Sequence, residues 1–136
     1  MSWKLNRSEF LLRGEFTKLV VPSVTALHPF CDVVKMAAPL VITDELGFLR
    51  AAISAYGFGV SKGDNCLCAL VDFQDNTSWR IAEFEEFIKA ISKAVEPGSY
   101  IEFETDRGDL VRYVFLHDSV ERWTKPHILY AQKEAI

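Results

Sequence analysis

Apolar residues recur at helical spacing between residues 81 and 95. One face of such a helix would carry the apolar side chains of Phe84, Phe87, Ile88, Ile91 and Val95. The opposite face would carry the charged side chains of Glu83, Glu85, Glu86, Lys89 and Lys93. A spacing of three and four residues is typical of an amphipathic helix that packs against a core. The pattern predicts a helix over 81–95, ended by Pro97-Gly98, with its apolar face buried.

The hydrophobic pattern then changes to a period of two residues. Outward positions Tyr100, Glu102 and Glu104 alternate with apolar neighbours, and the alternation returns over 110–117. Between the two runs lies a turn-forming segment in which Gly108 can adopt a positive φ. The pattern predicts two antiparallel strands, 100–105 and 110–117, joined by a turn at 106–109, with a further turn at 117–119.

Two more elements are predicted upstream. Residues 44–56 carry apolar side chains at helical spacing, preceded by Thr43 as a possible N-cap and followed by Gly57, a residue suited to a helix end. Residues 66–73 form a short apolar run of the kind found in buried central strands. We expect a helix over 44–56, a loop over 57–65 and a central strand over 66–73.

Other segments leave alternatives open. Residues 8–21 favour an extended strand or a hairpin that Pro22 would end. Residues 28–39 fit either a short helix or an irregular packed segment, and residues 127–131 could add one more strand. Taken together, the chain of 136 residues predicts a single α+β domain over 1–136. Its sheet would be mainly antiparallel, with amphipathic helices packed on one face.

Composition favours a cytoplasmic protein. No apolar run approaches the ~20 residues that cross a bilayer, so we expect no membrane association. The first residues lack the apolar core of a secretory signal, and the three cysteines, an odd number, fit a reducing compartment.

Charge is distributed unevenly along the chain. Residues 1–36 have five Lys/Arg and three Asp/Glu, whereas residues 64–109 have four Lys/Arg and eleven Asp/Glu. An acidic segment repels phosphate backbones, which argues against nucleic-acid binding and favours a basic protein partner. A surface that serves only solubility is the alternative. The sequence does not indicate an oligomeric state.

A metal site is the sharpest chemical hypothesis. His28, Cys31, Cys66 and Cys68 together would form a Cys3His set, a known structural zinc combination. Their spacing differs from the usual zinc-binding knuckles, and reduced cysteines often pack as small apolar residues. We therefore expect neither a metal nor another cofactor.

Catalytic signatures are weak. Glu102 and Glu104 would share one strand face and could act as an acid–base pair, although the exposed face of a half-covered sheet is the simpler interpretation. Cys31 could pair with His117 or His127 only if the fold brought them together. Glycines at 57–63 follow a predicted helix, which is the wrong topology for a phosphate loop. The sequence leans against an enzyme.

The sequence thus favours a non-catalytic protein-binding or inhibitory module with an acidic, aromatic-bearing surface. Its predicted binding residues are Trp79, Glu83, Glu86, Glu102 and Glu104. In size and charge alone the chain is similar to the small acidic bacterial immunity proteins, which bind and neutralise toxins. A small-ligand or metal-binding protein, or a small enzyme using carboxylate or Cys/His chemistry, is the alternative.

Overall fold

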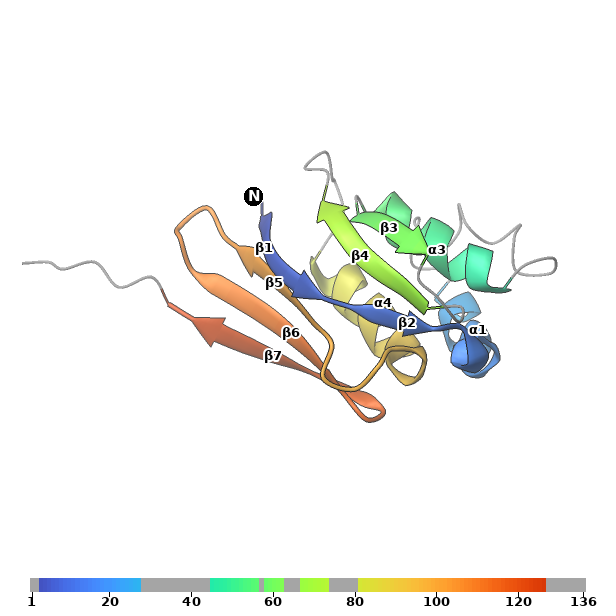
Figure 1. Ribbon diagram of the computed structural model, residues 1–136. Helices are drawn as coiled ribbons and strands as arrows, with labels where there is room; N and C mark the ends of the chain where they lie inside the picture. The colour runs from blue at the N-terminus through green and yellow to red at the C-terminus, as the bar shows by residue number, and fades with distance from the viewer. Residues whose placement is uncertain (1–2, 28–44, 57, 63–66, 74–80, 127–136) are drawn as a thin grey trace, which may run out of the picture.

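The N-terminal segment joins two antiparallel sheets. In the computed structural model, which describes residues 3–27, 45–56, 58–62, 67–73 and 81–126, this segment forms strands β1 (Lys4–Glu9) and β2 (Leu11–Arg13). β1 pairs with β5 (Tyr100–Glu104), and β2 pairs with β4 (Leu67–Phe73). The extended segment therefore runs from one sheet into the other, as Figure 1 shows.

The larger sheet has the strand order β1-β5-β6-β7, with β6 at Leu110–Leu116 and β7 at Ser119–Lys125. The predicted turn between β5 and β6 is confirmed. Thr105 donates its N–H to the Asp109 carbonyl at 2.9 Å, and Gly108 adopts a φ of 84°. This positive φ is what glycine permits without steric cost. The smaller sheet has the order β2-β4-β3, with β3 at Phe58–Lys62, so β4 is a central strand as predicted.

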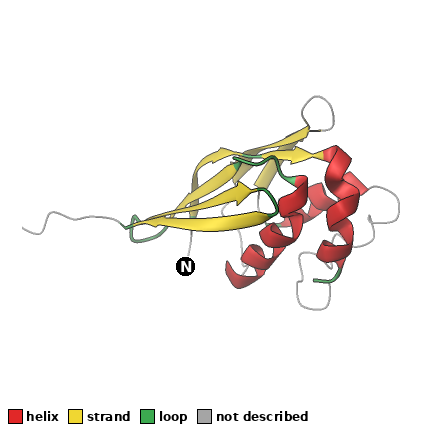
Figure 2. Cartoon of the chain, turned by 90° about the horizontal axis from the view of Figure 1, so that it is seen from below, coloured by secondary structure: helices red, strands yellow, loops and turns green. Residues whose placement is uncertain are grey.

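The described helices are α1 (Thr17–Thr25), α3 (Glu45–Ala55) and α4 (Ile81–Ile91), with short 3-10 turns at Gly14–Phe16 and Ser92–Ala94. Figure 2 shows the helices gathered at one end of the molecule, with the strands projecting from them. α4 carries the predicted apolar face, and all four of its apolar anchors, Phe84, Phe87, Ile88 and Ile91, are buried.

Aromatic rings from both sheets and from α4 form the centre of the core. The ring of Phe84 lies 5.8 Å from that of Phe103 on β5, 5.7 Å from Tyr113 on β6 and 5.8 Å from Phe58 on β3. Tyr56 approaches the same ring at 5.4 Å. Because one ring contacts both sheets and the residue that follows α3, these elements share a single core. The predicted α+β class with a mainly antiparallel sheet is confirmed.

Pro22 does not end a regular element, so that prediction is wrong. After β2 the chain continues through the 3-10 turn at Gly14–Phe16 into α1, and Pro22 lies inside this helix. Proline removes one backbone donor, yet the buried side chains of Val20 and Val24 anchor the helix on both sides of it. Tertiary packing outweighs the local penalty here.

The loop predicted at 57–65 is also partly wrong, because Phe58–Lys62 forms β3 against β4. A glycine-rich sequence has little strand preference by itself, and cross-strand pairing supplies it. The strand β7 was not predicted either. Its alternation is hidden because its side chains are nearly all exposed.

Some predictions lie outside the described residues. These are the segment 28–39, the strand at 127–131 and the side chain of Trp79. Among the helices that are described, none is long and apolar enough to cross a membrane.

Candidate functional site: the outer face of the larger sheet

Strand β5 divides its side chains between the two faces of the larger sheet. Ile101 and Phe103 point into the core and are buried. Tyr100, Glu102 and Glu104 alternate with them and lie on the face away from the core, because successive side chains of a strand point to opposite faces. This outer face is where we place the candidate site.

Strand register assembles a polar row across the outer face. Arg7 on β1 lies opposite Glu102, Glu102 lies opposite Arg112 on β6, and Arg112 lies opposite Trp123 on β7. Residues directly opposite each other in neighbouring strands have Cβ atoms about 5 Å apart. Four strands thus bring two arginines, a carboxylate and an indole into one line.

Glu102 is the fixed centre of this row. Its Oε1 accepts a hydrogen bond from Nε of Arg112 at 3.0 Å and forms an ion pair with Nη2 of the same residue at 3.0 Å. Its Oε2 accepts a hydrogen bond from Nδ2 of Asn6. Only 7% of the residue is exposed. The expectation that Glu102 is a solvated surface carboxylate is therefore wrong, although Glu104 is exposed. With both oxygens engaged, Glu102 is held as part of the wall and is not presented as a free base.

The guanidinium of Arg112 is held from a second side. Its Cζ lies 4.1 Å from the centroid of the Tyr100 ring, an attractive cation–π arrangement. The pair with Glu102 and the stacking on Tyr100 together fix the plane of Arg112. A group that is ordered before binding loses less entropy when a ligand arrives.

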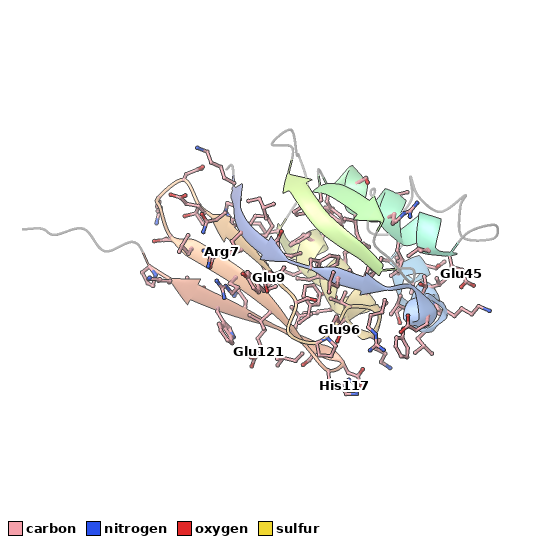
Figure 3. The ribbon with its side chains drawn as sticks, viewed as in Figure 1. Arg7, Glu9, Glu45, Glu96, His117 and Glu121 are labelled. Carbon is pink, nitrogen blue, oxygen red and sulfur yellow. The ribbon has the colours of Figure 1, made fainter. Side chains whose placement is uncertain are left out.

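A hollow of about 530 Å³ lies over this row, and we call it the sheet-face hollow. It is lined by Asn6, Arg7, Glu102, Leu110, Arg112, Trp123, Thr124 and Lys125. Trp123 is 53% exposed, and its indole N–H donates to Oε1 of Glu121 at 3.3 Å. Figure 3 labels Arg7 and Glu9 on β1 and Glu121 on β7, the two outer strands of the sheet.

The charge of the sheet-face hollow is positive. Its lining has three cations, Arg7, Arg112 and Lys125, against the single carboxylate of Glu102. Glu102 is already neutralised by Arg112, and neither Arg7 nor Lys125 forms an ion pair with a described residue. The hollow therefore offers an aromatic side chain and an available cation on β7, and a second available cation on β1. A second hollow of about 460 Å³, lined by residues 8–11 and 96–99, has only the two carboxylates of Glu9 and Glu96 as charges.

The inner face uses its polar groups differently. Tyr113 donates its hydroxyl to Oε2 of Glu85 on α4 at 2.7 Å, and Arg122 of β7 donates to the same oxygen at 2.8 Å. Burial, reinforced by the Glu85 carboxylate, raises the pKa of Tyr113 above its ordinary value. Glu85 raises the pKa of Arg122 as well. This cluster ties α4 to the sheet and keeps the phenol protonated.

Three carboxylates of the acidic segment 64–109 pair with residues from outside it. Glu85 pairs with Arg122 at 2.8 Å, Glu96 with Arg13 at 3.3 Å, and Glu102 with Arg112 at 3.0 Å. Each of these arginines lies outside 64–109 in the sequence. Folding thus offsets part of the charge asymmetry that the sequence displays.

The predicted binding residues lie on two separate surfaces. Glu83 and Glu86 belong to α4, whose apolar side packs against the inner face of the sheet, and Glu86 pairs with Lys89 at 3.3 Å. Glu102 and Glu104 belong to the outer face. The core lies between the two sets, so the structure does not bring them together. Trp79 lies outside the described residues.

Several residues of the sheet-face hollow were not predicted. Asn6, Arg7 and Lys125 carried no signal in the sequence, because their strands were not predicted there. Arg112 could be found from the hairpin register, which places it opposite Glu102. Trp123 could be found only by recognising that β7 continues the meander.

The other chemical hypotheses concern residues that the structure mostly leaves undescribed. Of the proposed metal ligands, His28, Cys31 and Cys66 lie outside the described residues, and Cys68 lies in β4. Within the described part of the chain, no group of three or more His, Cys, Asp or Glu residues could hold a metal ion. His117 and Asp118 form the exposed β6–β7 turn, where Nε2 of His117 lies 3.8 Å from Oδ2 of Asp118.

Comparison of the chain with protein-family models, with curated proteins and with solved structures gives no match.

Proposed function

We propose that the protein is a non-catalytic binding module that meets a partner protein through the outer face of its larger sheet. The observation that carries this proposal is the sheet-face hollow, in which the half-exposed Trp123 lies beside Arg112 of the fixed Glu102–Arg112 pair. Tryptophan, tyrosine and arginine are the residues that most often dominate binding energy at protein interfaces. All three types occur together here.

The chemistry of the hollow suggests what the partner presents. Arg7 on β1 and Lys125 on β7 are available cations at the two edges of the hollow, and Trp123 lies on β7 near Lys125, so a carboxylate next to an apolar side chain would fit. The sequence favoured a basic partner, because the acidic segment 64–109 has few cations of its own. The ion pairs of Glu85, Glu96 and Glu102 weaken that argument. We therefore propose an acidic, apolar segment of a protein as the ligand.

Peptide selection tests the proposed ligand chemistry directly. Immobilised protein is challenged with a displayed library of random peptides, and the enriched sequences are determined. We expect enrichment of Asp or Glu adjacent to an aromatic or aliphatic residue, with binding that weakens as salt rises. Enrichment of Lys- and Arg-rich peptides would instead support the helix face that carries Glu83 and Glu86.

Variants then locate the binding surface. Arg7→Glu and Trp123→Thr should each weaken the affinity for an enriched peptide by about tenfold or more, because each removes a side chain that lines the hollow. Lys18→Glu is the matched control, since Lys18 is an exposed cation on α1 and the charge change is the same. The pair Glu83→Lys and Glu86→Lys tests α4.

The outcomes separate the hypotheses. Loss of binding in Arg7→Glu with retention in Lys18→Glu supports the sheet-face hollow. Loss only in the α4 pair overturns this site. If no peptide or protein binds, and a small molecule is turned over with activity lost in Glu102→Gln, the enzyme alternative replaces the proposal.

A further inference from the structure

Strand β7 has an edge that no described strand covers. It is the last strand of the order β1-β5-β6-β7, and six of its seven residues are exposed. An open strand edge is a template for pairing with another chain, and natural proteins usually shield it. We propose that β7 pairs with β7 of a second copy of this chain, in antiparallel orientation about a two-fold axis at Trp123. This inference goes beyond the proposed function and does not rest on it.

The direction of the β7 backbone groups follows from hydrogen bonds on β6. Phe115 donates its N–H to the Ser99 carbonyl, and its own carbonyl accepts from Gly98, both at 2.8 Å. Phe115 therefore directs both of its backbone groups towards the β5 side. In an antiparallel sheet, successive residues direct these groups to alternate sides. The even-numbered residues of β6 thus bond to β7.

The same alternation determines which backbone N–H and C=O groups of β7 do not bond to β6. Even-numbered residues of β6 lie opposite odd-numbered residues of β7, such as Arg112 opposite Trp123. The odd-numbered residues therefore use their backbone groups inside the sheet. Val120, Arg122 and Thr124 direct their N–H and C=O groups outward. These three residues provide the ladder for an added strand.

A two-fold axis perpendicular to the sheet limits the possible registers. It places residues of like parity opposite each other, because opposed side chains share a face. An axis at Glu121 or at Arg122 would place two like charges directly opposite each other, which is unfavourable. An axis at Thr124 would bring Pro126, which has no N–H, opposite the outward groups of Arg122, next to the axis. An axis at Trp123 brings Pro126 opposite Val120 instead, at the far end of the ladder, and leaves the central pairs of Arg122 and Thr124 intact.

An axis at Trp123 gives complementary contacts on both sides. Glu121 of each copy lies opposite Lys125 of the other, so the pairing creates two symmetric opposite-charge pairs on the outer face. Arg122 and Thr124 exchange backbone hydrogen bonds across the interface. The two Trp123 indoles, each 53% exposed in the single chain, meet at the axis. Aromatic pairs across strands stabilise a sheet beyond the area that they bury.

The shape of the molecule leaves room for this arrangement. The strands project from the helices, and the arrowhead of β7 in Figure 1 lies at the projecting end. An axis near this end keeps the helices of the two copies apart. The product would be one continuous eight-stranded sheet, in which Trp123 and Lys125 of each sheet-face hollow are engaged across the axis. Because a single edge strand buries little area, the dimer should be weak and dependent on concentration.

Sedimentation equilibrium from micromolar to millimolar concentration tests the dimer itself. We expect a reversible monomer–dimer equilibrium that Thr124→Pro abolishes. A proline is tolerated at an edge position whose N–H faces outward, so the monomer should keep its fold and its circular dichroism spectrum. A chain that stays monomeric throughout this range, or a dimer that Thr124→Pro leaves unchanged, overturns the proposal.

Charge exchange tests the register. Glu121→Lys alone and Lys125→Glu alone should each weaken self-association by about tenfold, because each places like charges opposite each other. A mixture of the two single variants should form a heterodimer in preference to either homodimer, since both opposed pairs are then complementary. The chain that carries both substitutions should regain the wild-type association. Arg107→Glu, on the exposed β5–β6 turn, is the matched control and should have no effect. Equal association of the mixture and the single variants would show that the axis does not lie at Trp123.

Discussion

The two faces of the larger sheet use the same strands for opposite purposes. On the inner face, Phe103 and Tyr113 pack against Phe84, and polar atoms serve to attach α4. On the outer face, Glu102 and Arg112 form a fixed polar pair beside the half-exposed Trp123. Adjacent residues of one strand therefore differ: one packs in the apolar core and the next forms polar contacts on the outer face. The difference shows that apolar packing is concentrated on the inner face, while the outer face presents polar and partly exposed aromatic side chains.

The largest expected effect is on the inner face. Phe103→Ala should lower the free energy of unfolding by about 3–5 kcal/mol, because it removes a fully buried ring and leaves a cavity among other rings. Urea denaturation monitored by circular dichroism measures this change. A loss below about 1 kcal/mol would mean that Phe103 is not a central part of the core.

The next effect concerns the buried pair of the outer face. Glu102→Gln should cost about 1–3 kcal/mol, since it leaves the guanidinium of Arg112 partly buried without its counter-charge. In a second series, Glu102→Leu should also lower the free energy of unfolding. Adding Arg112→Leu to it should recover part of that loss, because the double variant has no unpaired charge. A double-mutant cycle by urea denaturation gives the coupling. Strictly additive costs would show that the two side chains are independent.

A smaller effect links the inner face to pH. The raised pKa of Tyr113 means that the folded protein holds the phenol proton more tightly than the unfolded chain does. This stability is fully present below the unfolded pKa of 10 and is lost as the pH rises from there towards the folded value. One such group lowers the free energy of unfolding by about 1.4 kcal/mol per pH unit above pH 10. Unfolding free energies at several pH values should show a steeper decline for wild type than for Tyr113→Phe. If the two proteins lose stability equally as the pH rises, Tyr113 is not the cause of the decline.

The smallest expected effect on stability is at the exposed indole. Trp123→Thr keeps a residue suited to strands and should change the free energy of unfolding by less than about 0.5 kcal/mol, because the side chain is half exposed. Thermal and urea denaturation measure this. The same variant should lose binding at the outer face. A variant that loses stability and binding in proportion would show that Trp123 acts through the fold and not through contact with a ligand.

Strong periodic segments were predictable because their pattern depends on local geometry. The buried face of α4, the β5–β6 hairpin with Gly108 and the helix α3 all follow from spacing along the chain. β3, β7 and the helix around Pro22 did not follow, because none of them carries a clear periodic pattern. The segment of β3 is rich in glycine, the side chains of β7 are nearly all exposed, and Pro22 argues locally against a helix. The candidate site was predicted only in part. Glu102 and Glu104 were named, whereas the hollow itself depends on β1 and β7.

The sequence alone determined the α+β class, the amphipathic helix and the alternation that separates the two faces of β5. Hydrophobic periodicity is sufficient for these features, because it states which side of an element avoids water. Only the tertiary structure decided which charged side chains pair with each other. The acidic segment 64–109 looks like an exposed acidic surface along the chain, but Arg13, Arg112 and Arg122 reach it from other elements. Ion pairing depends on distance in space, and strand pairing sets that distance between residues far apart in sequence.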